Sequence, residues 1–254
     1  MQKAIVLAAG KGTRLQTEGI TVPKVMREAD GKPLLHYVLK NLDFIDRENI
    51  VLVVGYRRED VLAAFGDYPY AVQEPQLGTG HAAAVAKEAV GDYDGPVLVC
   101  YGDMPLLRRS TYENLIAAHL QEGNVCTLLT GDCQWELPYG RILRGEDGTF
   151  LGVVEDRDCT PEQRAIRELN VGVYVFDCKK LFQALGQLKN NNVQKEYYLT
   201  DVPAILRAEG GRVGACCACH DEELIGVNTV EQLRMVEETL RREKLQQAGR
   251  DPLS

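Results

Sequence analysis

The sequence predicts an α/β domain with a mostly parallel β-sheet. Apolar runs of strand length alternate with amphipathic runs of helix length along the chain, and this alternation is typical of parallel strands joined by helices. One run, Pro96–Cys100, is apolar throughout, as expected for a strand covered on both faces of a parallel sheet. No repeat or linker divides the 254 residues, which suffice for one large domain.

The elements of the first half follow from the length and spacing of these runs. Ala4–Ala9 is the first expected strand, and Leu34–Leu42 is apolar at helical spacing. Between them, Gly10–Pro33 is expected to form a loop. The other elements expected here are strands at Ile50–Val54, Tyr70–Gln73 and Pro96–Cys100, a short helix continuing over Val61–Phe65, and an alanine-rich helix at Gly80–Val90.

In the second half the expected strands are shorter and are separated by turn residues. We expect them to extend or flank the main sheet. A long, highly charged helix is expected from Thr229 to about Gln247, followed by a frayed polar tail. We therefore divide the chain into a domain at residues 1–228 and a C-terminal helix and tail at residues 229–254. The remaining expected elements are strands at Asn124–Leu129, Arg141–Leu143, Phe150–Val154 and Val171–Phe176, and helices at Lys179–Leu188 and Tyr198–Glu209.

Composition and charge exclude several classes of function. The net charge of −8 argues against a nucleic-acid partner, which would require a basic face. No apolar stretch reaches the roughly 18 residues that cross a bilayer, and Ala4–Ala9 is too short for a secretory signal. We therefore expect a cytoplasmic protein whose eight cysteines are reduced. The Cys216–His220 cluster lacks a second ligand pair at zinc-finger spacing, and we interpret it as a strand and its exit.

A glycine-rich turn follows the first expected strand. In Gly10–Arg14 the glycines let backbone N–H groups approach an anion without an intervening side chain, and Lys24 adds a second cation after Pro23. The turn matches neither the P-loop nor the dinucleotide-binding fingerprint, so by itself it is equally compatible with a turn selected for its geometry. Together with Lys24 it predicts a locally bound phosphate.

The order of motifs resembles that of the sugar-1-phosphate nucleotidyltransferases. It most resembles the uridylyltransferase half of the bifunctional enzymes that make UDP-N-acetylglucosamine, over about residues 3 to 240. The resemblance implies a Rossmann-like (GT-A-like) three-layer α/β/α nucleotidyltransferase fold, with residues 1–228 as the nucleotidyltransferase domain. The motifs that carry it are Leu7–Arg14, Pro23–Val25, Gly31–Leu34, Gln73–His81, Tyr101–Asp103, Tyr139–Arg141, Val154–Glu155, Leu169–Gly172, Glu196–Asp201 and Gly226–Asn228.

A nucleotide site and a sugar site are implied by this resemblance. A glutamine amide offers both a donor and an acceptor to the edge of uracil, so Gln73 and Gln76 suit a UTP site. Carboxylate and amide groups such as Glu155 and Asn170 suit the hydroxyls of a hexose without identifying which hexose. The implied nucleotide-binding residues are Leu7, Ala8, Ala9, Gly10, Lys11, Gln73, Gln76, Gly78 and Thr79, and the implied sugar-phosphate-binding residues are Tyr101, Gly102, Gly140, Glu155, Asn170, Tyr198 and Thr200.

A magnesium site is implied at Asp103 and Asn228. Asp103 follows a buried strand, so its carboxylate is expected at the carboxyl edge of the sheet, where open α/β folds bind ligands. Mg²⁺ prefers oxygen ligands and takes one or two protein groups together with phosphate and water. Considered singly, Asp103 is also typical of a turn and Asn228 of a helix cap.

The implied reaction is uridylyl transfer from UTP to N-acetylglucosamine 1-phosphate. Because the attacking phosphate oxygen is already an anion, catalysis is expected to depend on positioning and charge neutralisation. Arg14 and Lys24 are the expected catalytic cations, assisted by Lys11. His36, His81, His119 and His220 are expected to be structural or surface residues.

Two departures from the family pattern and several alternatives remain. The Leu15–Pro23 loop is longer than expected, which makes the placement of Lys24 less secure than that of Asp103. The chain contains no hexapeptide repeats, so the acetyltransferase half is expected to be absent, and the oligomeric state stays open. Alternative functions are transfer to glucose 1-phosphate or from another nucleoside triphosphate, a non-catalytic nucleotide-sugar-binding module, and partner binding by the charged C-terminal helix.

Overall fold

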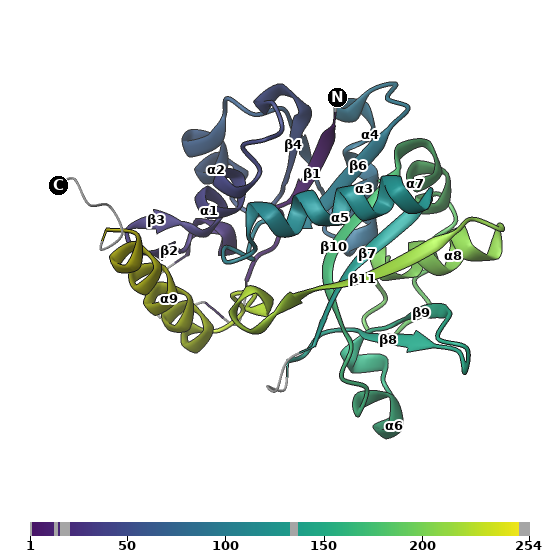
Figure 1. The fold of residues 1–254 in the computed structure, drawn as a ribbon. Helices are drawn as coiled ribbons and strands as arrows, with labels where there is room; N and C mark the ends of the chain where they lie inside the picture. Colours follow the sequence, from purple (N-terminus) through teal and green to yellow (C-terminus); the bar gives the residue numbers. More distant parts are fainter. Residues whose placement is uncertain (1, 13–14, 16–20, 133–136, 249–254) are drawn as a thin grey trace.

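The structure is a computed structural model that describes residues 2–12, 15, 21–132 and 137–248 (Figure 1). Within these residues a nine-stranded sheet runs in the order β11-β7-β10-β6-β1-β4-β5, with β8 paired to β10 and to β9. The strands are β1 (Lys3–Leu7), β4 (Ile50–Val54), β5 (Tyr70–Val72), β6 (Pro96–Tyr101), β7 (Cys126–Asp132), β8 (Arg141–Arg144), β9 (Phe150–Val154), β10 (Leu169–Asp177) and β11 (Val213–His220).

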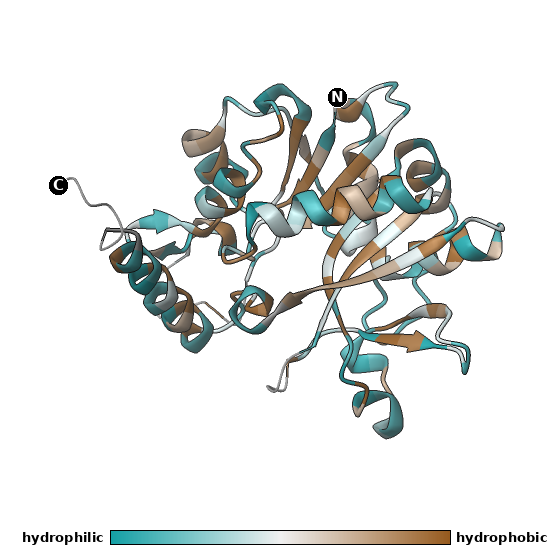
Figure 2. Ribbon diagram, viewed as in Figure 1, coloured by the Kyte–Doolittle hydropathy of each residue, from teal (hydrophilic) through white to brown (hydrophobic). Residues whose placement is uncertain are grey.

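The predicted mostly parallel sheet is confirmed. β1 lies between β4 and β6 and is parallel to both, β5 extends the sheet in parallel beyond β4, and β11 is parallel to β7. β10 is antiparallel to both of its neighbours, β6 and β7, which makes the sheet mixed. Parallel β4, next to β1, is apolar along its whole length: all five of its residues are buried, and this strand is hydrophobic throughout in Figure 2.

Helices cover both faces of the sheet, which confirms the three-layer architecture. Alternate residues of β1 face opposite layers: Ala4 and Val6 join a cluster with α1, α2 and α5, whereas Ile5 and Leu7 join a second cluster with α3, α4, α7 and α8. This period of two is the side-chain alternation of a strand. The helices are α1 (Leu34–Asn41), α2 (Arg58–Phe65), α3 (Thr79–Val85), α4 (Lys87–Val90), α5 (Arg109–Glu122), α6 (Pro161–Arg164), α7 (Cys178–Leu185), α8 (Val202–Ala208) and α9 (Val230–Ala248).

Three features differ from the sequence prediction. Helix α5 was not expected, because its buried face includes the polar residues Thr111 and His119 beside Tyr112, Leu115 and Ile116, which weakens the apolar period. A small hairpin of β2 (Glu28–Ala29) and β3 (Lys32–Pro33) lies within the expected loop. The helix expected at residues 80–90 is two helices, α3 and α4, and the one expected at residues 198–209 begins as a 3₁₀ turn at Leu199–Asp201 before α8.

Helix α9 packs on the domain beside the β2–β3 hairpin (Figure 1). Val236 is fully buried in a third apolar cluster, which Leu15, Leu34 and Ile225 share. The remainder of α9 alternates between hydrophilic and hydrophobic residues in Figure 2, so the helix has one packed stripe, as the apolar spacing predicts. Among the described residues, no helix is both long enough and apolar enough to cross a membrane.

Candidate active site

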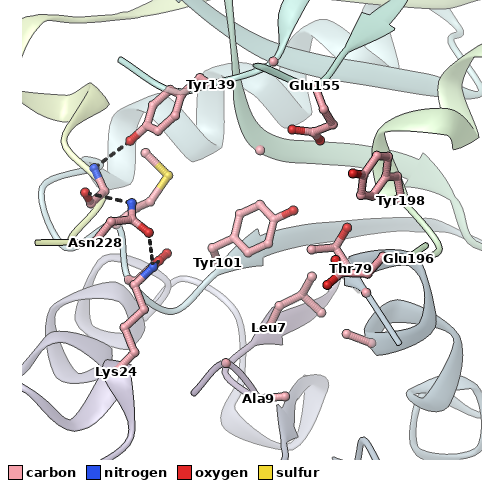
Figure 3. Close-up of a pocket in the computed structure, with 18 of the residues that line it drawn as sticks. Leu7, Ala9, Lys24, Thr79, Tyr101, Tyr139, Glu155, Glu196, Tyr198 and Asn228 are labelled. Carbon is pink, nitrogen blue, oxygen red and sulfur yellow. Dashed lines mark hydrogen bonds and ion pairs between the residues drawn. The ribbon is translucent and has the colours of Figure 1, made fainter. Parts of the chain in front are cut away.

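A cavity of about 500 Å³ opens at the carboxyl edge of β1 and β6 (Figure 3). This is the edge of an open α/β sheet at which ligands bind. Most of the residues that the sequence predicts for the site converge on this cavity. Those that line it are Leu7, Ala9, Gly10, Lys24, Gln73, Gln76, Gly78, Thr79, Tyr101, Asp103, Gly140, Glu155, Asn170, Tyr198 and Asn228.

The other predicted residues lie behind the cavity or outside it. Ala8 is buried and its N–H donates to the Val53 carbonyl at 2.8 Å, so this residue continues the sheet. Gly102 is also buried, and a Cβ there would lie 3.0 Å from Val25 Cγ1. Both residues therefore shape the wall of the cavity through the backbone.

Of the three expected phosphate-binding cations, Lys11 lies outside the cavity and Arg14 is not among the described residues. Lys11 is exposed, and its Nζ lies 5.5 Å from the centroid of the Tyr56 ring, where it makes a cation–π contact. Arg14 lies outside the described residues. Among the described residues predicted as cations, Lys24 is the one that lines the cavity.

The amide nitrogens of the two predicted glutamines fix the loop after β5, one within the loop and one to the segment that follows β1. Gln73 is 5% exposed, and its Nε2 donates to the Gly78 carbonyl at 2.8 Å. Gln76 Nε2 donates to the Ala9 carbonyl. Gly78 has a φ of 109°, and a Cβ there would lie 2.6 Å from the Tyr197 carbonyl oxygen, so only glycine fits this position.

Lys24, Asp103 and Asn228 form one polar cluster at the opposite end of the cavity (Figure 3). The Lys24 ammonium pairs with Asp103 Oδ2 and donates to Asn228 Oδ1 at 2.7 Å. The side chains of the ion pair are only 14% and 17% exposed. A carboxylate oxygen and an amide oxygen thus converge on one cationic atom, and this pair of oxygen ligands fits a hard divalent cation that also takes phosphate and water.

Glu155 and Asn170 form the polar wall on the other side. Thr200, which is buried behind the cavity, donates from its hydroxyl to Glu155 Oε1 at 2.9 Å. Burial raises the pKa of Glu155 above its ordinary value, and the nearby Asp158 and Asp201 carboxylates add to this rise. Asn170 Nδ2 donates to the Tyr174 hydroxyl at 2.8 Å, whereas its Oδ1 is buried without a hydrogen-bond partner. A buried acceptor in this state favours a ligand that brings a donor.

Two tyrosines present hydroxyls near this wall. Burial raises the pKa of Tyr101, and burial with the Asp158 and Glu155 carboxylates raises the pKa of Tyr198 to about 12. Both phenols therefore stay protonated at neutral pH, and the Tyr198 hydroxyl donates to Gln194 Oε1 at 3.2 Å. The ring of Tyr101 lies against Gly172, where a Cβ would approach Tyr101 Cε2 to 2.3 Å.

Several residues that line the cavity had no role in the sequence prediction. Tyr139, Gly172, Glu196 and Gly226 stand inside motifs that carried the resemblance, so the signal was present without an assignment. Met104, Pro138 and Gln194 carry no chemical signal that would have identified them. All seven line the cavity.

Two solved structures, both of nucleotidyltransferases, share this architecture and define the class of fold. A putative glucose-1-phosphate thymidylyltransferase from Bacillus anthracis, in complex with sucrose, superposes with a TM-score of 0.73 at 17% identity, covering 95% of this chain and 96% of that chain. A UDP-glucose pyrophosphorylase complexed with UDP-glucose superposes with a TM-score of 0.71 at 18% identity, covering 96% and 99%. The chain has this nucleotidyltransferase fold.

The chain belongs to the family of MobA-like NTP transferase domains, whose model matches residues 4–200. It is 42% identical to the Bifunctional protein GlmU of Exiguobacterium sibiricum over 94% of this chain and 53% of the relative. It is also 42% identical to that of Syntrophotalea carbinolica over 97% of this chain and 53% of the relative. The chain thus spans about half the length of the curated relatives it matches. These findings confirm the predicted resemblance to the nucleotidyltransferase half of a bifunctional enzyme.

Proposed function

We propose that this chain is a uridylyltransferase that joins UTP and N-acetylglucosamine 1-phosphate into UDP-N-acetylglucosamine with release of pyrophosphate. The convergence of three groups on one cavity supports the proposal: the glutamine loop at residues 73–78, the Lys24–Asp103–Asn228 cluster and the Glu155–Asn170 wall. These groups match, in order, the base, the phosphates and the sugar of such a product.

The proposed step is a direct displacement at phosphorus. A phosphate oxygen of the sugar 1-phosphate forms a bond to the α-phosphorus of UTP, while the bond from that phosphorus to the bridging oxygen of pyrophosphate breaks. The electron pair of the broken bond leaves with pyrophosphate. No proton has to be removed from the nucleophile, so the chain needs to hold the two anions in line and to offset their charge.

The base would be recognised through side-chain and backbone groups of the 73–79 segment. Because the amide nitrogens of Gln73 and Gln76 donate to backbone carbonyls, we infer that their amide oxygens face the ligand. The imino N–H of uracil offers the matching donor. Cytosine has an unprotonated ring nitrogen at this position, so an acceptor there favours UTP over CTP.

The phosphates would lie at Lys24, which has the cation nearest to the reacting groups. Its ammonium would exchange its contacts with Asp103 and Asn228 for phosphate oxygens. We propose that Arg14, and less directly Lys11, add positive charge to the same phosphates, as the resemblance implies. A buried cation of this kind is worth more than an exposed one because water screens it less.

A divalent cation, which we propose is Mg²⁺, would be held by Asp103 and Asn228. Bound Mg²⁺ would neutralise charge on the phosphates. Asp103 and Asn228 contribute the two oxygens that converge on Lys24 Nζ. Asp103 is fixed by the end of β6, and the backbone of residue 227 donates to the Asp103 carbonyl at 3.0 Å, so the two ligands are held relative to each other.

The sugar would lie against Glu155 and Asn170. The carboxylate accepts from two hydroxyls, and the partnerless Asn170 Oδ1 accepts from a hydroxyl or from the N–H of an acetamido group. Tyr101 is the neighbouring donor, and the Tyr198 hydroxyl oxygen is a neighbouring acceptor because its proton is donated to Gln194 Oε1. The resemblance favours N-acetylglucosamine 1-phosphate over glucose 1-phosphate, and the proposed cytoplasmic location follows the same resemblance.

Pyrophosphate release tests this proposal when it is measured for a matrix of nucleoside triphosphates and sugar 1-phosphates, with and without Mg²⁺. We expect release only when UTP, N-acetylglucosamine 1-phosphate and Mg²⁺ are present together. A preference for glucose 1-phosphate or another triphosphate would replace the substrate assignment and keep the mechanism. No release from folded protein would overturn the enzyme proposal in favour of a nucleotide-sugar-binding module.

A further inference from the structure

The hydroxyl of Tyr139 joins two segments that are far apart in the sequence. It donates to the Leu224 carbonyl at 2.6 Å and accepts from the Gly226 N–H at 2.8 Å. A Cβ on Gly226 would lie 2.8 Å from the Tyr139 hydroxyl oxygen, so the glycine allows the phenol to approach the backbone this closely. One oxygen atom therefore satisfies a donor and an acceptor of the segment at residues 224–228.

This segment carries Asn228, and the contacts continue to its side chain. Figure 3 labels Tyr139, Asn228 and Lys24 and marks with dashed lines the hydrogen bond between Asn228 and Lys24. Asn228 Nδ2 donates to the Gly226 carbonyl at 3.3 Å. The amide group is thereby turned so that its Oδ1 faces the Lys24 ammonium at 2.7 Å. The Gly226 N–H, which donates to Tyr139, and the Gly226 carbonyl, which accepts from Asn228, belong to two adjoining peptide units. The orientation of the Asn228 oxygen thus depends on the position of Gly226, which Tyr139 holds from the N-terminal side while the Val227 N–H donates to the Asp103 carbonyl at 3.0 Å on the other side.

Tyr139 itself is fixed in the wall of the cavity by its neighbour Arg141. The Arg141 guanidinium is buried and donates to the Leu137 carbonyl at 3.3 Å and to the Tyr139 carbonyl. The intervening residues Pro138, Tyr139 and Gly140 all line the cavity. Gly140 also accepts from the Asn170 N–H at 2.8 Å. The same short segment therefore contacts Asn170 of the proposed sugar wall and Gly226, two residues before the proposed metal ligand Asn228.

We propose that Tyr139 is a positioning residue whose hydroxyl sets the orientation of the Asn228 amide oxygen toward the divalent cation. The inference rests on the proposed function, because it assumes that Asn228 is a metal ligand. Removing the hydroxyl leaves the Gly226 N–H with the Leu224 carbonyl, to which it also donates at 3.0 Å, and takes away the contact that holds both groups to the cavity wall, so that Gly226 can shift. The Asn228 oxygen then spends less time in its binding orientation, so metal affinity falls while the carboxylate of Asp103 is unchanged.

A Tyr139→Phe variant tests this role because it removes one oxygen and keeps the ring. Loss of one such hydrogen-bonding group corresponds to about a tenfold change in an equilibrium constant. We therefore expect about a tenfold increase in the Mg²⁺ concentration that gives half-maximal activity, restoration of kcat at saturating Mg²⁺, and an unchanged KM for UTP. Mn²⁺ binding to the protein in the presence of UTP, measured by electron paramagnetic resonance, should weaken by a similar factor.

Tyr37→Phe is the matched control. Tyr37 also donates its hydroxyl to a backbone carbonyl, that of Ala29, at 2.7 Å, and it lies outside the cavity. This variant should leave both the Mg²⁺ dependence and Mn²⁺ binding unchanged. An equal effect of the two substitutions would show that any lost buried hydroxyl loosens the protein, and would overturn the proposal.

A double-mutant cycle with Asn228→Ala separates positioning from general damage. If Tyr139 acts through Asn228, Tyr139→Phe should have no further effect on Mn²⁺ binding in the Asn228→Ala protein. Additive effects of the two substitutions would overturn the inference. If the wild-type protein binds Mn²⁺ and shows this coupling but makes no nucleotide sugar, only the uridylyltransferase proposal is overturned. If the wild-type protein binds no Mn²⁺, the metal site and the role of Tyr139 are overturned together.

Discussion

The surroundings of Glu155 favour the protonated form of its carboxyl group. Burial, together with the Asp158, Asp201 and Asp156 carboxylates, raises its pKa above the ordinary 4.5, and the hydrogen bond from Thr200 lowers it in part. Because the protonated form is favoured in the folded protein, the contribution to stability is full below pH 4.5 and is lost as the pH rises through the raised pKa. An ionised Glu155 at neutral pH is thus maintained at a cost in folding free energy, which favours a role in binding.

A Glu155→Gln substitution should separate these two effects. It removes the buried charge, so we expect a melting temperature at neutral pH equal to or above that of the wild type. It also removes the charged acceptor, so we expect KM for the sugar 1-phosphate to rise by about tenfold or more. Steady-state kinetics with varied sugar 1-phosphate would measure this, and equal KM values for the two proteins would move the sugar site elsewhere.

The pH dependence of the same comparison provides a second prediction. As the pH falls through the raised pKa of Glu155, the wild-type KM for sugar 1-phosphate should rise toward that of the glutamine variant. The ionisation of the substrate affects both proteins alike, so the ratio of their KM values reports Glu155 alone. A ratio that stays constant from neutral pH to pH values near the ordinary carboxyl pKa of 4.5 would contradict the assignment.

At the scale of elements, the irregular pairing of β10 shapes the cavity. The register between β10 and β7 shifts between Asn170 and Tyr174, and Gly172 within this shift has a φ of 84°. Both the conformation and the approach of Tyr101 exclude a side chain there. The irregularity therefore brings Asn170 into the cavity wall while Tyr101 packs over the glycine.

Gly172→Ala should accordingly destabilise the protein by about 2–4 kcal/mol, through backbone strain and overpacking. Gly152→Ala on β9 is the control, because a Cβ there meets nothing within 4 Å, and it should change stability by less than about 1 kcal/mol. Urea unfolding of the two variants measures both values. Equal stabilities would show that Tyr101 moves aside without cost.

The elements also show which part of the fold the sequence could reveal. The runs that became β1, β4 and β6 were predictable because residues buried on both faces of a parallel sheet must be apolar. Helix α5 was not, because Thr111 and His119 occupy its buried face. The role of Tyr139 could not be predicted either, since its partners Leu224 and Gly226 are brought to it only by the tertiary fold. Asp103 and Asn228 could be named as candidate ligands because motifs mark them, and both line the cavity.

At the scale of the whole molecule, α9 closes an apolar cluster that connects the beginning of the chain to its end. Val236 of α9 packs with Leu15, Leu34, Ile225 and others. Gln232, in the first turn of α9, accepts from the Asn228 N–H at 2.7 Å. The helix thus supports the segment that carries the proposed metal ligand, although it lies outside the cavity.

Val236→Ala should leave a cavity in this cluster and lower the free energy of unfolding by about 2 kcal/mol. Leu245→Ala on the same helix is the control, because Leu245 is 75% exposed and its truncation should cost less than about 0.5 kcal/mol. Chemical denaturation of both variants measures the difference. If Val236→Ala were as stable as the control, α9 would not be packed on the domain in solution.

Mass spectrometry of the product formed from UTP, N-acetylglucosamine 1-phosphate and Mg²⁺ tests most directly whether this cavity carries uridylyl transfer. The wild type and an Asp103→Asn variant, both shown to be folded by circular dichroism, would be compared side by side. We predict that the wild type makes UDP-N-acetylglucosamine and that the variant makes at least about a hundredfold less. The reason is that a neutral amide cannot replace the carboxylate at the cation, and losing one such electrostatic group lowers a reaction rate by about 10²-fold or more. Equal product from the two proteins, or none from the folded wild type, would contradict the account.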